Sequence, residues 1–489
     1  METAQTRTSG IVTRAGAALG ALALIAMTQV DLVGGEHSYF EPLVWALLGF
    51  AAWRQSWPAA AATALGLLVF RGFAVAEQCC NFFLQRPLEL RNDIRLLPDL
   101  QSVLTDTGGH DTLRTVVIAL GGFFLLTLVA CRLLAERRSE LGAVFGVSMI
   151  ASLAVPDAPA VSSRLVVELA GSEGELEQRI AVEHRSRSAW RDLRPSAFLN
   201  RDVHLVLIES YGEVVFDHPE LRAFREEIFP ELDGVLLENS LSVASRFYRS
   251  PTFGGRSWLA HASIDSGLMI TDQLRYEQVL NSDLTPLAEH FNAAGYRTST
   301  IAPGIMKPYP EGAWFAYGNT IYRKDLDYDG PRYGWALVPD QWLLNHVTQK
   351  LHEIPGPRFS EWHLVSTHAP FARHAPFLTR SELGAQSPYE GREAITFDIQ
   401  WPYLERAHEG YAHAMRYEFH ALAQVLPSWT ESGGSVVLVG DHQPNGAMME
   451  PGASWNVPCH VISRDLPWPG FAAGWVPNAE EQAAPLSRL

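Results

Sequence analysis

Two residues of the kinds that bind metal ions stand side by side near the end of the chain, Asp441 and His442. They follow residues 436–439, an apolar and mostly β-branched run that predicts a strand buried on both faces of a parallel sheet. In open α/β sheets the binding and catalytic residues lie just beyond the carboxyl ends of the strands. The pair could therefore offer one oxygen and one nitrogen to a divalent ion. A turn with a helix-capping Asp and a solvated His is the structural alternative.

Two further predicted strands also end in side chains that can bind a metal ion or a phosphate. The apolar run 204–208 stops at Glu209, and the run 362–367 stops at His368, shortly before a proline that breaks the ladder. A lone Glu or His at a strand end is more often structural than functional. Because the carboxyl ends of parallel strands meet at one edge of a sheet, we expect these side chains to act together.

A fourth candidate is a hydroxyl group at the start of a predicted helix. Gly254 and Gly255 lead into a helical pattern, which places Ser257 at the helix N-terminus with Arg256 beside it. The free backbone N–H groups at that end favour anions. An ordinary N-cap serine after a glycine-rich turn is the alternative. Thr252, which precedes the glycines, is the rival nucleophile.

Taken in chain order, these motifs resemble the alkaline phosphatase/sulfatase superfamily, and more closely its lipoteichoic acid synthase and phosphoglycerol transferase branch. They are a strand ending in Glu, then Gly-Arg-Ser, Thr-His-Ala-Pro-Phe and Gly-Asp-His. The resemblance implies a sulfatase-like α/β domain and a divalent metal, commonly manganese, although the ligand types also suit zinc or magnesium. It further implies that Ser257 is both nucleophile and ligand and that His368 acts near the substrate. The implied metal ligands are Glu209, Ser257, Asp441 and His442.

The chain departs from this branch at two places. The usual nucleophile of the branch is Thr, for which Ser257 is a chemically modest substitution. After the predicted strand at 297–302, the branch often has His-Gly and then residues that contact phosphoglycerol, whereas this chain has Pro303, Gly304 and then Lys307. The head-group pocket of the branch is therefore not reproduced. We predict that the substrate is contacted by Arg256, His261, Lys307 and His368.

Composition bounds the class of protein. The 489 residues, 47% of them hydrophobic, can bury a large core and suggest more than one unit. A formal net charge of −16 argues against nucleic acid as the main partner, since neutralising phosphates needs basic patches. The cysteines are too scattered for a disulfide framework or a CxxC zinc site: they are Cys79, Cys80, Cys131 and Cys459. We therefore expect any metal to be held by His and carboxylate side chains.

Apolar runs dominate the first 155 residues, which we interpret as a helical membrane domain of about five spans. The spans are expected at about 15–33, 40–54, 57–76, 114–134 and 139–155. A signal peptide at residues 1–30 would not explain the four later runs. Arginines before the first span, between the second and third, and between the fourth and fifth place the N-terminus in the cytoplasm. The chain after residue 155 is then expected outside the cytoplasmic (inner) membrane.

The remainder divides into a connector at 156–200, a catalytic α/β domain at 201–475 and a tail at 476–489. Short β-rich runs alternate with helical stretches, which is typical of a mainly parallel sheet. Strands are predicted at 203–209, 297–302, 361–367, 435–440 and 457–463, and helices at 258–266, 284–294 and 405–426. Trp335 and Asp340 belong to a predicted loop that caps the next helix, with pocket contact an open alternative. Tyr417 and Glu418 are expected to pack or pair locally on the last helix.

These features predict a membrane-anchored, metal-dependent phosphotransferase acting on an anionic lipid or polymer outside the cytoplasmic membrane. It would move a phosphoglycerol-type group from a lipid donor to an acceptor through a covalent serine intermediate. Two alternatives stay open: a phosphodiesterase- or sulfatase-type hydrolase with the same metal site, and a non-catalytic membrane scaffold. A formylglycine sulfatase needs Pro two residues and Arg four residues after the modified side chain. Counted from Ser257, those positions hold Leu259 and His261.

Overall fold

The structure is a computed structural model of the whole chain. The residues that it describes are 57–94, 195–198, 200–335, 338–385, 387–399, 407–450, 452–464, 472–473 and 484–485. The chain divides into two compact units. One comprises Met1–Phe82 with Arg86–Gly174, and the other Phe83–Gln85 with Glu175–Leu489. Each unit is described by itself below.

The described part of the first unit is helical. Helix α3, Trp57–Leu84, includes the third predicted span at 57–76, and the short helix α4, Leu90–Asp93, follows it. Within residues 57–94 and the other described ranges, no helix combines the length and apolar character needed to cross a membrane. The other four predicted spans lie outside the described residues. Of the predicted connector at 156–200, only Pro195–Phe198 and Asn200 are described.

The second unit is built on a nine-stranded sheet whose main path runs β10-β2-β9-β8-β1-β5-β3-β4. From β8 to β4 the strands are parallel, whereas β9 is antiparallel to both β8 and β2. Ala484–Pro485 of the predicted tail forms β11 and pairs with β2. The strands are β1 Val203–Ile208, β2 Ser242–Arg249, β3 Arg297–Ala302, β4 Asn319–Tyr322, β5 Arg358–Leu364, β8 Ser435–Gly440, β9 Asn456–Ser463 and β10 Ala472–Ala473. A separate antiparallel pair joins β6, Arg373–His374, to β7, Ile395–Thr396.

The predicted α/β domain with a mainly parallel sheet is confirmed, with corrections to individual strands. Strands β3 and β8 have the predicted bounds, whereas β5 begins and ends three residues earlier than predicted. Strands β2 and β4 were not predicted. Because β5 ends at Leu364, His368 lies in the loop beyond the strand rather than directly at its end.

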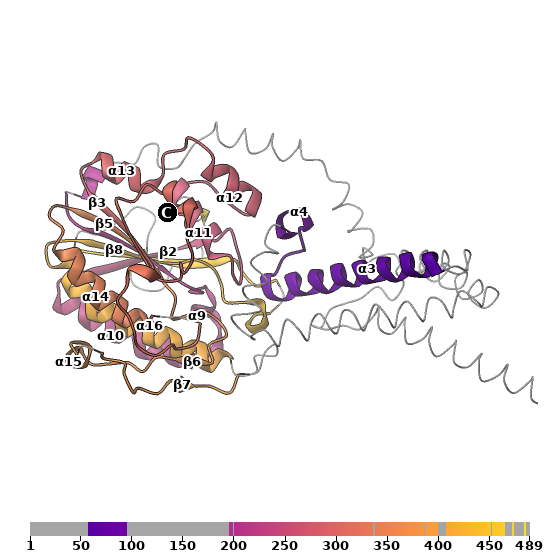
Figure 1. The fold of residues 1–489 in the computed structure, drawn as a ribbon. Helices are drawn as coiled ribbons and strands as arrows, with labels where there is room; N and C mark the ends of the chain where they lie inside the picture. Colours follow the sequence, from indigo (N-terminus) through magenta and orange to yellow (C-terminus); the bar gives the residue numbers. More distant parts are fainter. Residues whose placement is uncertain are drawn as a thin grey trace, which may run out of the picture. The chain divides into compact units, whose positions relative to one another are not determined.

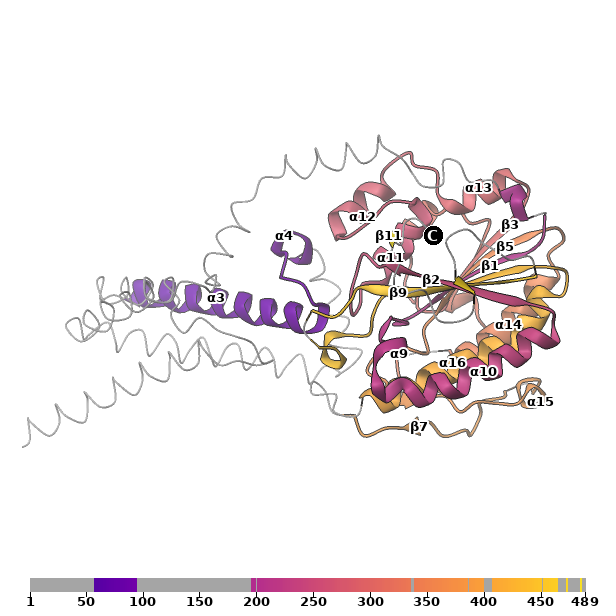
Figure 2. The ribbon, with the colours of Figure 1, turned by 180° about the vertical axis from the view of Figure 1, so that it is seen from behind.

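Helices cover both faces of the sheet, so that the unit has three layers (Figures 1 and 2). One face carries α11 Ser257–Ser266, α12 Gln273–Leu280 and α13 Leu287–Ala293, and the other carries α10 Arg222–Glu238, α14 Asp340–His352 and α16 Ala407–Thr430. The predicted helices correspond to α11, α13 and α16. Shorter elements are α9 Val214–Asp217, α15 Arg380–Leu383, η4 Pro219–Leu221, η5 Pro310–Ala313, η6 Arg323–Asp325 and η7 Gly446–Met448.

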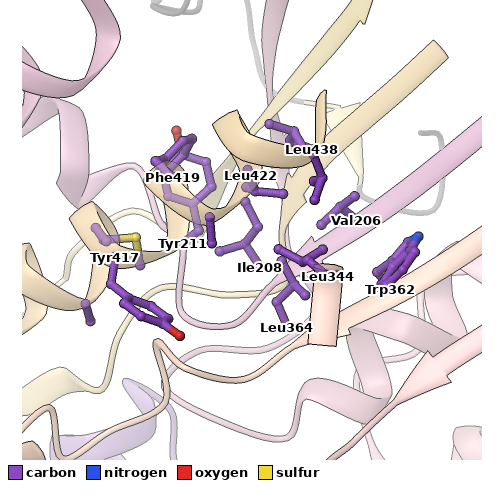
Figure 3. Packing of buried hydrophobic residues seen from close by; sticks show 14 of the residues in the cluster. Val206, Ile208, Tyr211, Leu344, Trp362, Leu364, Tyr417, Phe419, Leu422 and Leu438 are labelled. Carbon is purple, nitrogen blue, oxygen red and sulfur yellow. The ribbon is translucent and has the colours of Figure 1, made fainter. Parts of the chain in front are cut away.

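Strand β1 lies in the middle of the sheet and contributes side chains to the hydrophobic clusters on both faces of the sheet. Because side chains alternate along a strand, Val206 and Ile208 belong to the cluster with α14 and α16, shown in Figure 3. Leu205 and Leu207 belong to the opposite cluster with α11 and α13. All six residues of β1 are buried, as its apolar run predicts. The carboxyl end of this strand is thereby held in place from both faces.

A buried acid pair anchors the loop that carries His368. The Oδ2 atom of Asp340 accepts hydrogen bonds from the backbone N–H groups of Val365 (2.7 Å) and Ser366 (2.5 Å). The fully buried carboxyl group of Glu418 meets no other hydrogen-bond donor in the described part of the chain, and its partner is the carboxyl group of Asp340. Burial, followed by the nearby Asp340, raises the pKa of Glu418 well above its usual value. Because the N–H groups favour the charged form of Asp340, we assign the proton to Glu418.

This assignment predicts how Glu418→Gln changes thermal stability with pH. A carboxyl group whose pKa is raised on folding costs nothing below its unfolded pKa, and the cost grows as the pH rises above that value. Gln cannot ionise, so the variant should gain stability relative to the native chain at pH 8 and gain less at pH 5. Each kcal/mol gained should raise the melting temperature by about 2–4 °C. Thermal unfolding of the purified full chain measures this, with the exposed Glu238→Gln as the control. A pH-independent difference would contradict the buried proton.

Candidate active site

The candidate site lies at the carboxyl edge of three neighbouring parallel strands. Strand β1 is hydrogen-bonded to β8 on one side and to β5 on the other, and Ile208 is level with Gly440 and Leu364 in the two registers. The next residues along β1 and β8 are Glu209 and Asp441. The sheet register thus places two carboxylates next to each other, although they are far apart in the sequence.

The backbone around Asp441 fixes the orientation of its carboxylate. The Oδ1 atom accepts hydrogen bonds from the N–H groups of Ser210 (2.8 Å) and His442 (2.7 Å). Gly440 allows the turn after β1 to approach the end of β8 closely, because a Cβ atom there would overlap the carbonyl oxygen of Tyr211. The Oδ2 atom is buried and has no hydrogen-bond partner among the described residues. A buried carboxylate oxygen without a hydrogen-bond partner is costly, and a bound cation would remove that cost.

The imidazole of His442 and the carboxylate of Glu209 complete this group. The Nδ1 atom of His442 lies 2.7 Å from the carbonyl oxygen of Gln443, to which it donates. This leaves Nε2 directed at the carboxylates, 3.3 Å from Glu209 Oε1 and 3.6 Å from Asp441 Oδ2. A second hydrogen bond that fixes the ring of a ligating histidine in this way is typical of metal sites.

The three side chains fit a divalent cation. One ligand atom from each of Glu209, Asp441 and His442 lies within 4.8 Å of the other two, and all three residues are buried. Two ligands of one ion with bonds of about 2.0–2.2 Å are separated by up to about 4.4 Å, which matches the contacts above. Two buried carboxylates and one imidazole offer oxygen and nitrogen ligand atoms. Such ligand atoms suit manganese, zinc or magnesium.

Mutual electrostatics shifts the pKa values of this group strongly. Burial and the Glu209 carboxylate raise the pKa of Asp441 to about 7. Burial lowers the pKa of His442, but the carboxylates of Asp441 and Glu209 outweigh it and raise the pKa to about 9. The pKa of Glu209 is held below its usual range although burial opposes this, chiefly because of the charge on His442. Positive charge, from a proton or from a metal ion, is therefore strongly favoured here.

The structure brings Ser257 to the same group. It is the first residue of α11, after Arg256 in a left-handed conformation with a φ of 62°. Its hydroxyl donates a hydrogen bond to Glu209 Oε2 at 2.9 Å and lies 3.1 Å from His442 Nε2. A hydroxyl at a helix N-terminus, next to three groups that fit a cation, has the surroundings of an activated nucleophile.

The rival nucleophile Thr252 has a different environment. It is fully buried, and its hydroxyl donates to the carbonyl oxygen of Gly255 at 2.5 Å within the glycine turn. Its backbone N–H lies 3.2 Å from Ser250 Oγ. The hydroxyl of Thr252 is therefore used to hold the turn that precedes Ser257.

His368 lies at the same edge, in the loop after β5. Its Nδ1 atom is 2.7 Å from the carbonyl oxygen of Ala369, to which it donates, so Nε2 is left for other partners. The ring of Trp335 stacks on the imidazole with centroids 4.1 Å apart and an angle of 13° between the planes. This contact with His368 supports the alternative that Trp335 lies at the pocket rather than only in a capping loop. The half-buried, stacked imidazole is held with one nitrogen available.

The other predicted substrate contacts have different environments. His261 follows Ser257 by one turn of α11, and its Nε2 atom is 3.9 Å from Asp441 Oδ2. Arg256 precedes Ser257 and is half-buried, whereas Lys307 is exposed in the segment after β3. Sequence reasoning missed His363 of β5, whose Nδ1 atom lies 2.8 Å from that of His261. A histidine and a glutamate inside a buried strand were the signal that could have found it.

No protein-family model and no curated protein matches the chain. The chain is similar to solved transferases. They include the lipoteichoic acid synthase LtaP from Listeria monocytogenes, at 14% identity and a TM-score of 0.38, with 54% of this chain and 65% of that chain covered. The phosphoglycerol transferase GacH from Streptococcus pyogenes matches at 13% identity and a TM-score of 0.38, with 60% and 76% covered. The integral membrane lipooligosaccharide phosphoethanolamine transferase A (EptA) from Neisseria meningitidis matches at 14% identity and a TM-score of 0.43, with 91% and 88% covered.

The first two of these proteins are a lipoteichoic acid synthase and a phosphoglycerol transferase, the two groups that the sequence motifs of this chain resemble. The chain spans just under two thirds of the length of the lipoteichoic acid synthase.

Proposed function

We propose that this chain is a divalent-metal-dependent phosphotransferase that moves a phosphoglycerol-type group from a lipid donor to an acceptor through a covalent phosphodiester intermediate on Ser257. The observation that carries the proposal is the hydroxyl of Ser257, hydrogen-bonded to Glu209 and beside His442 at the N-terminus of α11. Glu209, Asp441, His442 and Ser257 would hold the metal, for which we propose Mn²⁺. When bound, the ion would neutralise phosphoryl charge and lower the pKa of the serine hydroxyl.

The chain's own residues supply the remaining parts of the reaction. Ser257 Oγ, after losing its proton to solvent, attacks phosphorus and forms an O–P bond, and Glu209 Oε2, which accepts the hydrogen bond of the hydroxyl, positions it for the attack. The P–O bond to the diacylglycerol half breaks, and His368 protonates the leaving oxygen through Nε2. In the second step an acceptor hydroxyl attacks phosphorus and its proton returns to His368, while the Ser257 O–P bond breaks and Oγ leaves in the deprotonated form that began the cycle. Arg256 and Lys307 would balance the charge of the anionic substrate.

Turnover of defined lipids by the full-length chain in detergent micelles tests the proposal. We expect diacylglycerol release from phosphatidylglycerol to need added Mn²⁺ and to stop with a chelator, with phosphatidylethanolamine as the comparison donor. Phosphoglycerol attached to an added glycan acceptor would support transfer, whereas free glycerol phosphate alone would favour a phosphodiesterase-type hydrolase. The absence of any metal-dependent turnover of phosphodiester lipids would contradict the proposal.

For the location of the reaction, we propose a multi-pass anchor of about five spans in the first 155 residues, with the catalytic domain outside the inner membrane. The charge asymmetry of the loops between the apolar runs supports this orientation. The test uses a reporter enzyme that is active only outside the cytoplasm. Fused after residue 160, this reporter should be active. A fusion after residue 36, in the first loop, should be active too, and one after residue 55 inactive. An inactive fusion after residue 160, together with an active one after residue 36, would rule out an odd number of spans.

A further inference from the structure

Hydrogen bonds hold the turn before His368 from two sides. On one side the backbone of Glu209 binds it: the N–H of Glu209 donates to the carbonyl oxygen of Leu364 at 3.3 Å, at the end of β5. The Thr367 hydroxyl donates to the carbonyl oxygen of Glu209 at 2.6 Å. The side chain of the same Glu209 belongs to the candidate metal site. The turn is therefore tied directly to the backbone that carries one of the proposed ligands.

Asp340, the first residue of α14, holds the turn from the other side. Its Oδ2 atom accepts hydrogen bonds from the backbone N–H groups of Val365 at 2.7 Å and Ser366 at 2.5 Å. In return, the N–H of Asp340 donates to the Ser366 hydroxyl at 3.1 Å. The Asp340 side chain is fully buried. Its loss would leave two N–H groups of the turn without their acceptor, which is costly away from water.

The direction of the His368 ring depends on this turn. The backbone N–H of His368 donates to the carbonyl oxygen of Val365 at 3.1 Å, so His368 is bonded to a residue that Asp340 itself binds. Its Nδ1 atom donates to the carbonyl oxygen of the next residue. A shift of the turn would thus carry Nε2 away from the reacting atoms, and a misplacement of about 1 Å can lower a rate by about 100-fold.

We infer that Asp340 is a positioning residue for the general acid: by accepting the N–H groups of Val365 and Ser366, it holds the turn that aims His368 Nε2 at the leaving oxygen of the lipid donor. This inference rests on the proposed function, in which His368 protonates that oxygen. A carboxylate at the start of α14 also stabilises the helix itself, whatever the turn does. The experiment must therefore separate positioning from stability.

Two donors with the same phosphoglycerol group and different leaving groups make this separation. Phosphatidylglycerol must release a diacylglycerol oxygen that needs a proton, whereas glycerol p-nitrophenyl phosphate releases p-nitrophenolate, a weak base that leaves without one. The first turnover of the Mn²⁺-loaded full chain is measured with each, so that only the formation of the Ser257 intermediate is compared. Asp340→Ala should slow diacylglycerol release by about 100-fold and p-nitrophenol release by less than about 3-fold. His368→Ala should show the same selectivity, with a loss of about 10²- to 10⁴-fold for the lipid.

Three further variants sharpen the comparison. Asp340→Asn keeps an acceptor oxygen and should keep most of the diacylglycerol release. Ser366→Ala removes the hydroxyl that accepts from the N–H of Asp340 and should slow diacylglycerol release alone, by about 3- to 10-fold. Asp202→Asn is the matched control, because Asp202 also accepts a backbone N–H, from Arg358 at 2.9 Å, but at the amino end of β5. It should change the rates with both donors little and by the same factor.

The outcomes separate this inference from the proposed function. Equal losses with the two donors in Asp340→Ala, or no loss with either, would overturn the positioning role and leave the metal site and Ser257 standing. Equal losses in His368→Ala would overturn both the inference and the role of His368 as the acid. A native chain that turns over neither donor would overturn the proposed function and the inference together. If Asp340→Ala does not fold, as judged by its melting temperature and Mn²⁺ binding, the ratio of the two rates in Ser366→Ala decides.

Discussion

Replacing Ser257 with alanine is expected to lower turnover of the lipid donor by roughly 10³- to 10⁶-fold, the range for loss of a covalent nucleophile. The reason is that the bond from Oγ to phosphorus can no longer form, while the groups around it stay in place. Mn²⁺ binding should weaken only modestly, since Glu209, Asp441 and His442 keep their positions at the strand ends. Steady-state kinetics and metal titration of the same preparation measure the two effects separately.

Two variants act as controls for this result. Ser257→Thr keeps the hydroxyl and should keep much of the activity. Thr252→Ala removes only the hydrogen bond to the Gly255 carbonyl, which costs about 1 kcal/mol of stability and little turnover. Mapping the phosphopeptide that accumulates with a slow phosphodiester substrate identifies the nucleophile directly. Phosphate on Thr252, or an active Ser257→Ala variant, would show that the assignment is wrong.

Asp441→Asn is expected to lower Mn²⁺ affinity by more than about 100-fold. Losing a residue that only orients a metal ligand lowers affinity by about 10- to 100-fold, and the loss of a direct ligand should lower it further. Lipid turnover should fall with metal binding. The metal-free variant should nevertheless be no less stable than the metal-free native chain, since Oδ1 can keep both N–H bonds and a buried charge disappears. Adding Mn²⁺ should raise the melting temperature of the native chain only.

The exposed Asp327 provides the matched control for this prediction. Its side chain is 92% exposed and lies 4.0 Å from Lys350, so Asp327→Asn should change neither Mn²⁺ affinity nor the melting temperature measurably. An Asp441→Asn chain that still gains thermal stability from Mn²⁺ would place the metal elsewhere.

Much of the site could be predicted from the sequence, because its parts follow strong local patterns. The buried runs of β1 and β8 are long, apolar and β-branched, and each stops at a metal-binding side chain, Glu209 or Asp441. Their meeting at one edge follows from parallel pairing alone. The glycine pair likewise predicted that Ser257 begins a helix. Strand β2 was missed because its Ser and Arg residues weaken the apolar pattern that identifies a buried strand, although it pairs along its whole length with β9.

Which side chains meet across these elements depends on how the elements pack in three dimensions. His261 and His363 are separated by 102 positions and contact each other because α11 packs over β5, a pairing for which the sequence carries no local signal. The two carboxylate oxygens of Asp441 have different surroundings because of the turn after β1. One oxygen accepts from backbone N–H groups, and the other has no hydrogen-bond partner among the described residues. The stacking of Trp335 on His368 also joins two separate loops. Local sequence determines burial and the ends of elements through the periodicity of apolar side chains, whereas contacts between elements depend on packing that acts only once the chain has folded.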